Sequence, residues 1–151
     1  MPIPGALHLA VLRSPYARAR ILSVDTSAAA AMPGVTAVFS GADLADAWAG
    51  PMPCAWPVTE DMKSPTHYPL AVGQANYVGD GVACVLATSA TAARDALDSI
   101  EVEYEPLEAV IDLEDALSDR VVIHDEIGTN RSYTWDLKIE ESEGQVDRAF
   151  A

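Results

Sequence analysis

The sequence is short of basic residues, cysteine and long apolar runs, and each shortage excludes a class of protein. Its 151 residues hold 9 Lys and Arg against 23 Asp and Glu, which gives a formal net charge of -14. Affinity for a phosphate backbone depends on clustered Lys and Arg, so nucleic acid is a poor partner for this chain. We therefore expect no nucleic-acid function.

The two cysteines, Cys54 and Cys84, stand far apart and neither has a second cysteine nearby. This spacing suits neither a zinc ribbon nor a redox dithiol. The longest apolar run within an expected strand, Val82–Ala87, is far shorter than the roughly 20 residues of a membrane span. The first residues also lack the basic and apolar regions of a secretory signal. The sequence thus predicts no membrane span and a cytoplasmic location.

Half of the chain is apolar, which is enough for one globular domain. A chain of this length buries roughly 68–70% of its unfolded surface, so its core needs no disulfide or metal. The acidic surplus is uneven, because residues 76–151 hold most of the acidic side chains. This second half could meet a basic partner.

Patterns typical of strands and helices alternate along the chain. Periodicity and turn residues predict strands at 7–12, 20–24, 35–39, 74–78, 82–87, 101–105, 121–123 and 133–139. Caps and apolar faces predict helices at 28–32, 41–44, 89–99, 113–117 and 145–151. We expect the strand at 7–12 to be well buried and the strand at 82–87 to be central, since both of its faces are apolar. The last helix looks cut off at its start.

The segment from Asp46 to Pro69 shows no period. It holds five of the ten prolines together with Trp48 and Trp56. Long structureless segments in compact domains usually serve a function or a partner, and disordered linkers are poor in aromatic residues. Our hypothesis is that Trp48 and Trp56 anchor an interface with a surface outside this chain.

Three groups of polar or glycine residues suggest chemistry. Glu101, Glu103 and Glu105 would stand about 6.5–7 Å apart on one strand face, a separation that glycosidases use, but any solvated strand shows the same pattern. The adjacent side chains of residues 124–126 (His-Asp-Glu) diverge, so a surface loop is expected. The glycine-rich segment 73–81 precedes a strand, whereas phosphate loops follow one, so Gly79 and Gly81 are interpreted as turn residues with positive φ. The residues by themselves predict no catalytic, cofactor-binding or metal site.

Three segments occur in an order that is informative as a set. They are Leu7–Ile21 followed by Val24–Thr26 and Met32–Val38, then 67–71 through 77–83, and then Ile100–Val110. Together they resemble the start of the molybdenum-binding large subunit of the xanthine dehydrogenase and aldehyde oxidase family. The ending, 124–130 and 147–150, resembles the carbon monoxide dehydrogenase-type large subunits of three-subunit bacterial enzymes. One departure is Gly81, where the family usually has proline.

The resemblance implies an α+β fold, the α/β-hammerhead, with a mixed sheet and a few short helices over residues 1–144. Residues 145–151 would begin the connection to the molybdenum-binding region. In the family a pterin-bound molybdenum hydroxylates an aldehyde, a heterocycle or carbon monoxide with oxygen from water, and electrons leave through iron-sulfur clusters to FAD. The cofactor motifs and the glutamate base lie downstream of the matching region. The resemblance therefore implies no cofactor and no catalytic residue in this chain.

Two interpretations from different classes follow. The first is a packing domain of a molybdenum hydroxylase large subunit, inactive alone, whose partners are the rest of that subunit and the iron-sulfur and flavin subunits. The alternative is a free-standing acidic protein-binding module. A small hydrolase that uses Glu101 and Glu103 ranks last.

Overall fold

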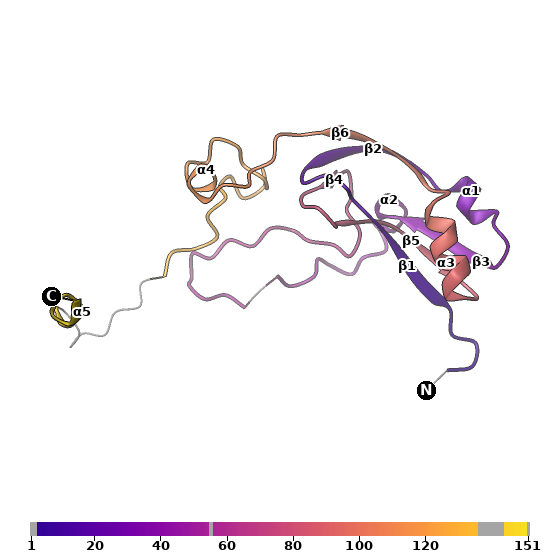
Figure 1. The fold of residues 1–151 in the computed structure, drawn as a ribbon, viewed down its shortest axis with the longest axis horizontal. Helices are drawn as coiled ribbons and strands as arrows, with labels where there is room; N and C mark the ends of the chain where they lie inside the picture. Colours follow the sequence, from indigo (N-terminus) through magenta and orange to yellow (C-terminus); the bar gives the residue numbers. More distant parts are fainter. Residues whose placement is uncertain (1–2, 55, 136–143, 151) are drawn as a thin grey trace.

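The computed structural model describes residues 3–54, 56–135 and 144–150, and they form two three-stranded sheets with short helices (Figure 1). The first sheet has the order β1-β5-β3, from His8–Arg13, Gly81–Ala87 and Val35–Ser40. The second has the order β4-β2-β6, from Gln74–Ala75, Ala19–Asp25 and Glu101–Pro106. Every pairing in these two sheets is antiparallel. The α+β prediction is confirmed, but two antiparallel sheets replace the expected mixed sheet.

Three of the helices begin where an N-cap side chain accepts from a first-turn backbone N–H group. The helices are α1 (Ser27–Ala30), α2 (Gly41–Leu44), α3 (Ala90–Leu97), α4 (Leu113–Leu117) and α5 (Gln145–Phe150). Ser89 Oγ accepts from Ala92 N at 3.1 Å and starts α3. Ser40 and Asp43 form a reciprocal capping box on α2. The predicted helices form within two residues of their expected bounds, and residue 151 of the last one lies outside the described residues.

The core lies between the first sheet and α3. Ala83, Val85 and Ala87 of β5 face α3, which contributes Ala93 and Ala96. Small side chains on both elements allow the helix to lie close to the sheet. Val24 and Val102 of the second sheet pack against the same cluster, so both sheets share one core.

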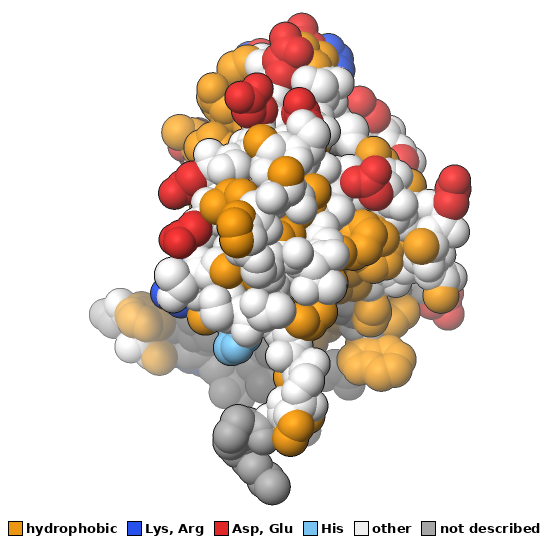
Figure 2. Space-filling model, turned by 90° about the vertical axis from the view of Figure 1, so that its right-hand side faces the viewer, with side chains coloured by type: hydrophobic (Ala, Val, Ile, Leu, Met, Phe, Trp, Pro, Cys, Tyr) orange, Lys and Arg blue, Asp and Glu red, His pale blue; other side chains and the backbone are white. Residues whose placement is uncertain are grey.

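The outer face of the second sheet meets solvent. Glu101, Glu103 and Glu105 of β6 are exposed while Val102 and Tyr104 are half-buried, as the alternation predicts. Acidic side chains gather at the top of the molecule, where β2 and β6 lie (Figure 2). The solvent-exposed face of this sheet therefore carries charged side chains along β6.

Three predictions about elements need correction. The first strand is not well buried, since β1 is an edge strand and Leu9 is 62% exposed. Residues 121–123 form bends rather than a strand. The expected strand at 133–139 is absent over residues 133–135, and its remainder lies outside the described residues.

Within the described ranges, no helix combines the length and the apolar character that a bilayer crossing needs.

Candidate functional site

The proline-rich loop, residues 46–73, runs out from α2 and returns to β4 as a long hairpin-like excursion (Figure 1). Its two arms are joined where Met52 N donates to His67 O at 2.8 Å. The second arm, residues 63–73, which we call the return arm, is also bonded to a segment far along the chain. Lys63 N donates to Ser132 O at 2.9 Å, and Ser132 Oγ donates to Lys63 O at 2.6 Å. The loop is thus held by specific contacts although its described residues form no helix or strand.

The structure gives the two tryptophans of this loop different surroundings. Trp48 is half-buried and stacks on Tyr68, with ring centroids 6.3 Å apart and an interplanar angle of 20°. Its indole N–H is buried without a hydrogen-bond partner. Trp56 is 89% exposed. Trp48 therefore packs on Tyr68 within the loop, whereas Trp56 is exposed. The hypothesis that both anchor an interface stays a prediction.

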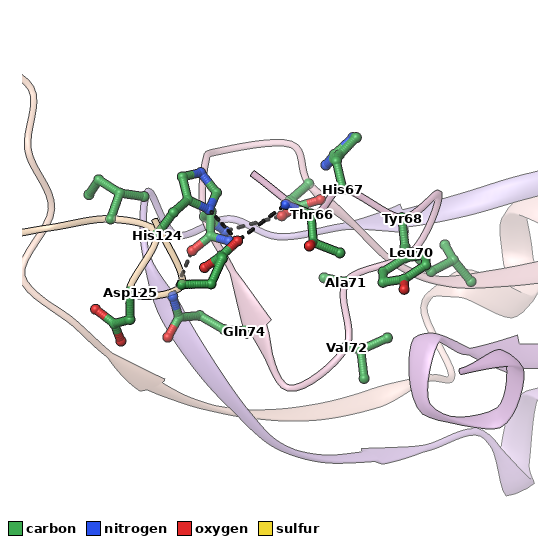
Figure 3. Close-up of a pocket in the computed structure, with 13 residues that line it drawn as sticks. Thr66, His67, Tyr68, Leu70, Ala71, Val72, Gln74, His124 and Asp125 are labelled. Carbon is green, nitrogen blue, oxygen red and sulfur yellow. Dashed lines mark hydrogen bonds and ion pairs between the residues drawn. The ribbon is translucent and has the colours of Figure 1, made fainter. Parts of the chain in front are cut away.

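Beside the return arm lies a polar cavity of about 320 Å³ (Figure 3). His124 and Asp125 line one side together with Gln74 of β4, and Tyr68 and Leu70 line the other. It is lined by Thr66, His67, Tyr68, Leu70, Ala71, Val72, Gln74, Asn76, Asp80, Ile123, His124, Asp125 and Glu126. The cavity therefore brings together segments that are far apart in the sequence.

Glu126 connects the two sides of this cavity. Its Oε1 accepts from Thr66 N at 3.2 Å and lies 3.7 Å from His124 Nδ1. The expected surface loop at 124–126 is confirmed, but its contact with Thr66 was not foreseen. No local pattern signals a contact across 60 residues.

Several polar and aromatic groups that line the cavity have partners among the described residues. The His124 imidazole lies beside the Glu126 carboxylate, and the His67 ring packs against Tyr77 with ring centroids 6.0 Å apart. Gln74 Nε2 donates to Asn76 Oδ1 at 2.7 Å, and Asn76 N donates to Asp80 Oδ2 at 3.1 Å. None of the described residues that line it is a serine or a cysteine.

Gly79 and Gly81, in the turn before β5 and at its start, are required for different reasons. Gly79 has φ +94°, so its interpretation as a positive-φ turn residue is confirmed. Gly81 has no positive φ and begins β5. A Cβ on Gly81 would stand 2.9 Å from Pro69 O, so glycine allows the return arm to approach the strand. The prediction for Gly81 was wrong because the constraint comes from a distant segment.

The described residues bring no set of metal-ligating side chains together. Within residues 3–54, 56–135 and 144–150, no three His, Cys, Asp or Glu side chains come together as a metal site. Burial raises the pKa of the Cys84 thiol, which disfavours the thiolate that binds metals. In the part of the chain that the structure describes, the buried side-chain polar atoms without hydrogen-bond partners belong to Arg18, Trp48 and Thr59, and none of these residues lines the cavity. We therefore derive no chemical step through a molybdenum-pterin group from these residues.

The glutamates of β6 have structural partners. Glu105 pairs with Arg20 of β2, and Glu103 accepts from Ser23 Oγ at 3.4 Å. Neither residue lines the cavity, and both face solvent. Nothing in this arrangement favours a hydrolase.

Comparison with known proteins gives consistent matches. The family described as "Aldehyde oxidase and xanthine dehydrogenase, a/b hammerhead domain" matches residues 1–108. The nicotine 6-hydroxylase large subunit of Paenarthrobacter nicotinovorans is 37% identical over 149 residues, which cover 99% of this chain and 18% of that protein. The carbon monoxide dehydrogenase large chain of Hydrogenophaga pseudoflava is 34% identical over 131 residues, which cover 86% of this chain and 15% of that protein.

A solved structure agrees with these matches. The crystal structure of quinoline 2-oxidoreductase from Pseudomonas putida 86 superposes with a TM-score of 0.77 and 41% identity, over 83% of this chain and 16% of that chain. The chain thus spans less than a fifth of the length of each of these three proteins.

Proposed function

Because this chain belongs to the aldehyde oxidase and xanthine dehydrogenase family and matches the a/b hammerhead domain of that family, we propose that it is a packing domain of a molybdenum hydroxylase large subunit. The oxidation of an aldehyde, a heterocycle or carbon monoxide, with water as the oxygen source, belongs to the rest of that subunit. The observation that carries this proposal is the coverage: 99% of this chain matches 18% of a hydroxylase large subunit.

In this proposal the molybdenum-pterin cofactor lies in the rest of the large subunit, and iron-sulfur clusters and FAD lie in partner subunits. The hammerhead domain extends over residues 1–144, beyond the matched residues 1–108, and residues 145–151 begin the connection. The location is cytoplasmic. Support comes from the family match.

The proline-rich loop is one surface by which this domain packs on the rest of the subunit. Trp56 is its anchor, because it is 89% exposed here and buried aromatics contribute much of the binding energy of interfaces. Met52 and Val58 of the same loop are exposed apolar neighbours of Trp56 in sequence. Trp48 supports the loop from within through its stacking on Tyr68.

Composition of the natural protein tests the proposed function. The protein is purified from its source, its polypeptide length is measured by mass spectrometry, and molybdenum, iron and flavin are quantified. We expect a large subunit several times longer than 151 residues, with equimolar molybdenum, and iron and flavin in co-purifying polypeptides. A natural product of 151 residues that binds a cationic ligand would instead support the acidic binding module.

The role of Trp56 is tested in the same natural protein with Trp56→Ala. We expect a clearly lower thermal unfolding midpoint, because the variant loses an interface anchor. Ile111→Ala is the matched control, since Ile111 is also exposed but lies outside the loop. Equal midpoints for both variants and the unmodified protein would remove Trp56 from the interface.

A further inference from the structure

The first sheet has a second face, opposite α3, that consists of two cross-strand rows of apolar side chains. In one row Leu86 is paired with Leu9 of β1 and with Ala37 of β3. In the next row Cys84 is paired with Val11 and with Phe39. Directly paired residues point to the same side of a sheet, so each row forms one strip. We call these six residues the outer face.

The opposite orientation of the core residues confirms this assignment of faces. Ala83, Val85 and Ala87 alternate with Cys84 and Leu86 along β5 and belong to the core beneath α3. Successive residues of a strand point to opposite faces. The outer face therefore points away from the core.

The second sheet of the same chain shows what a solvated face contains. There the paired residues are Arg20 with Glu105, Ser23 with Glu103, and Asp25 with Glu101. Antiparallel sheets that face water on one side alternate apolar and polar residues in this way. The outer face of the first sheet has no polar or charged side chain in its two rows. Its composition is that of a covered face.

This face is only partly covered within the described residues. Leu9 is 62% exposed, and the other five residues are half-buried. Leu70 of the proline-rich loop is buried near one corner, where a Cβ on Gly81 would lie within 3.3 Å of both Leu70 and Val11. The row of Leu9, Leu86 and Ala37 lies beyond this corner.

We propose that the outer face docks onto an apolar surface in the remainder of the same large subunit. This inference rests on the proposed function, because the remainder exists only if the chain is part of a longer protein. The chain covers 15–18% of the relatives it matches, so most of such a polypeptide lies outside these residues and is available to cover the face. The interaction is distinct from that of Trp56, since it involves the sheet and not the loop tip.

A second copy of the chain is a poorer occupant. Two rows across three strands make a patch of about 200 Å². A stable complex between separate proteins buries about 800 Å² on each partner. Each copy also carries a net charge of -14, which opposes association. A segment of the same polypeptide avoids both obstacles, because tethering supplies a high effective concentration.

The test uses the full-length natural protein and the substitution Leu9→Lys. Lysine at a covered position is buried without a partner, so docking is weakened and the neighbouring row becomes accessible. The readout is the rate at which N-ethylmaleimide labels Cys84, followed by mass spectrometry of its peptide. We expect slow labelling in the native unmodified protein and labelling at least about tenfold faster in the variant. The labelling rate follows the equilibrium between the covered and the opened face, and a tenfold change in that equilibrium needs only a modest change in free energy.

His8→Lys is the matched control. His8 is the adjacent residue on β1, is exposed, and points to the opposite side of the sheet. We expect it to leave both the thermal midpoint and Cys84 labelling unchanged. Leu9→Ala provides a milder variant if Leu9→Lys prevents folding, and it should raise the labelling rate by a smaller factor.

Three results would overturn the inference. They are rapid Cys84 labelling in the unmodified native protein, indistinguishable behaviour of Leu9→Lys and His8→Lys, and conversion of an oligomer to monomers by Leu9→Lys, which would identify a second copy as the occupant. Polypeptide length and molybdenum content are measured on the same preparation. If both match the expectation while the variants fail to differ, only this inference is refuted and the proposed function stands.

Discussion

Replacing Gly41 with alanine would drive a methyl group into the backbone of the proline-rich loop. Gly41 is buried at the start of α2, and a Cβ there would stand 2.0 Å from Ala71 O and 2.7 Å from Ala71 C. Its φ is not positive, so the penalty is steric and does not arise from backbone conformation. Ala71 would have to move by roughly 1.5 Å or more to reach an ordinary contact distance.

That movement has two costs that can be read from the structure. It breaks the hydrogen bond from Ala71 N to Gly81 O, which is 2.7 Å long and contributes about 1 kcal/mol. It also displaces Leu70, which is buried, and full burial of such a side chain stabilises by about 1.5–3 kcal/mol. We expect Gly41→Ala to lower the free energy of unfolding by about 2.5–4 kcal/mol.

Urea unfolding of this chain, followed by far-ultraviolet circular dichroism, measures the effect. Gly50→Ala is the control, because nothing lies within 4 Å of its Cβ and its φ is not positive. The control should change the free energy of unfolding by less than about 0.5 kcal/mol. A Gly41→Ala protein as stable as Gly50→Ala would show that the return arm does not pack against α2 as described.

Three further predictions concern single side chains. Ser89→Ala removes the cap of α3 and should cost about 1 kcal/mol in urea unfolding, and no loss would mean that Ala92 N finds another acceptor. The hydrogen bond from Ser40 N, with help from the Ser40 hydroxyl, lowers the pKa of Asp43 below its ordinary value of 3.8. The stabilisation that the Asp43 carboxylate contributes is therefore present above pH 3.8 and is lost as the pH falls through the pKa of the folded state. Asp43→Asn should flatten the acid limb of a curve of stability against pH, and an unchanged limb would contradict this reasoning. Replacing both Glu101 and Glu103 with Gln should leave the activity of the natural protein unchanged in steady-state assays, because both face solvent on β6; a large loss would revive the hydrolase alternative.

Local sequence patterns determined most of the elements. The apolar run of β5, the alternation of β6 and the Ser89 cap of α3 each reflect contacts within a few residues, and all three elements form where they were expected. The segment 121–123 is the exception, because three β-branched residues favour a strand only if a partner strand is present, and the structure provides none within the described residues.

The tertiary structure decided the features that depend on contacts between segments far apart in the sequence. The edge position of β1 leaves Leu9 exposed, the return arm requires glycine at position 81, and Thr66 meets Glu126 across the cavity. The different surroundings of Trp48 and Trp56 have the same origin, since only Trp48 finds Tyr68. The sequence alone determines which faces are apolar, because side-chain chemistry and strand period are local. Which apolar face is covered, and by what, depends on how strands far apart in the chain pair and pack.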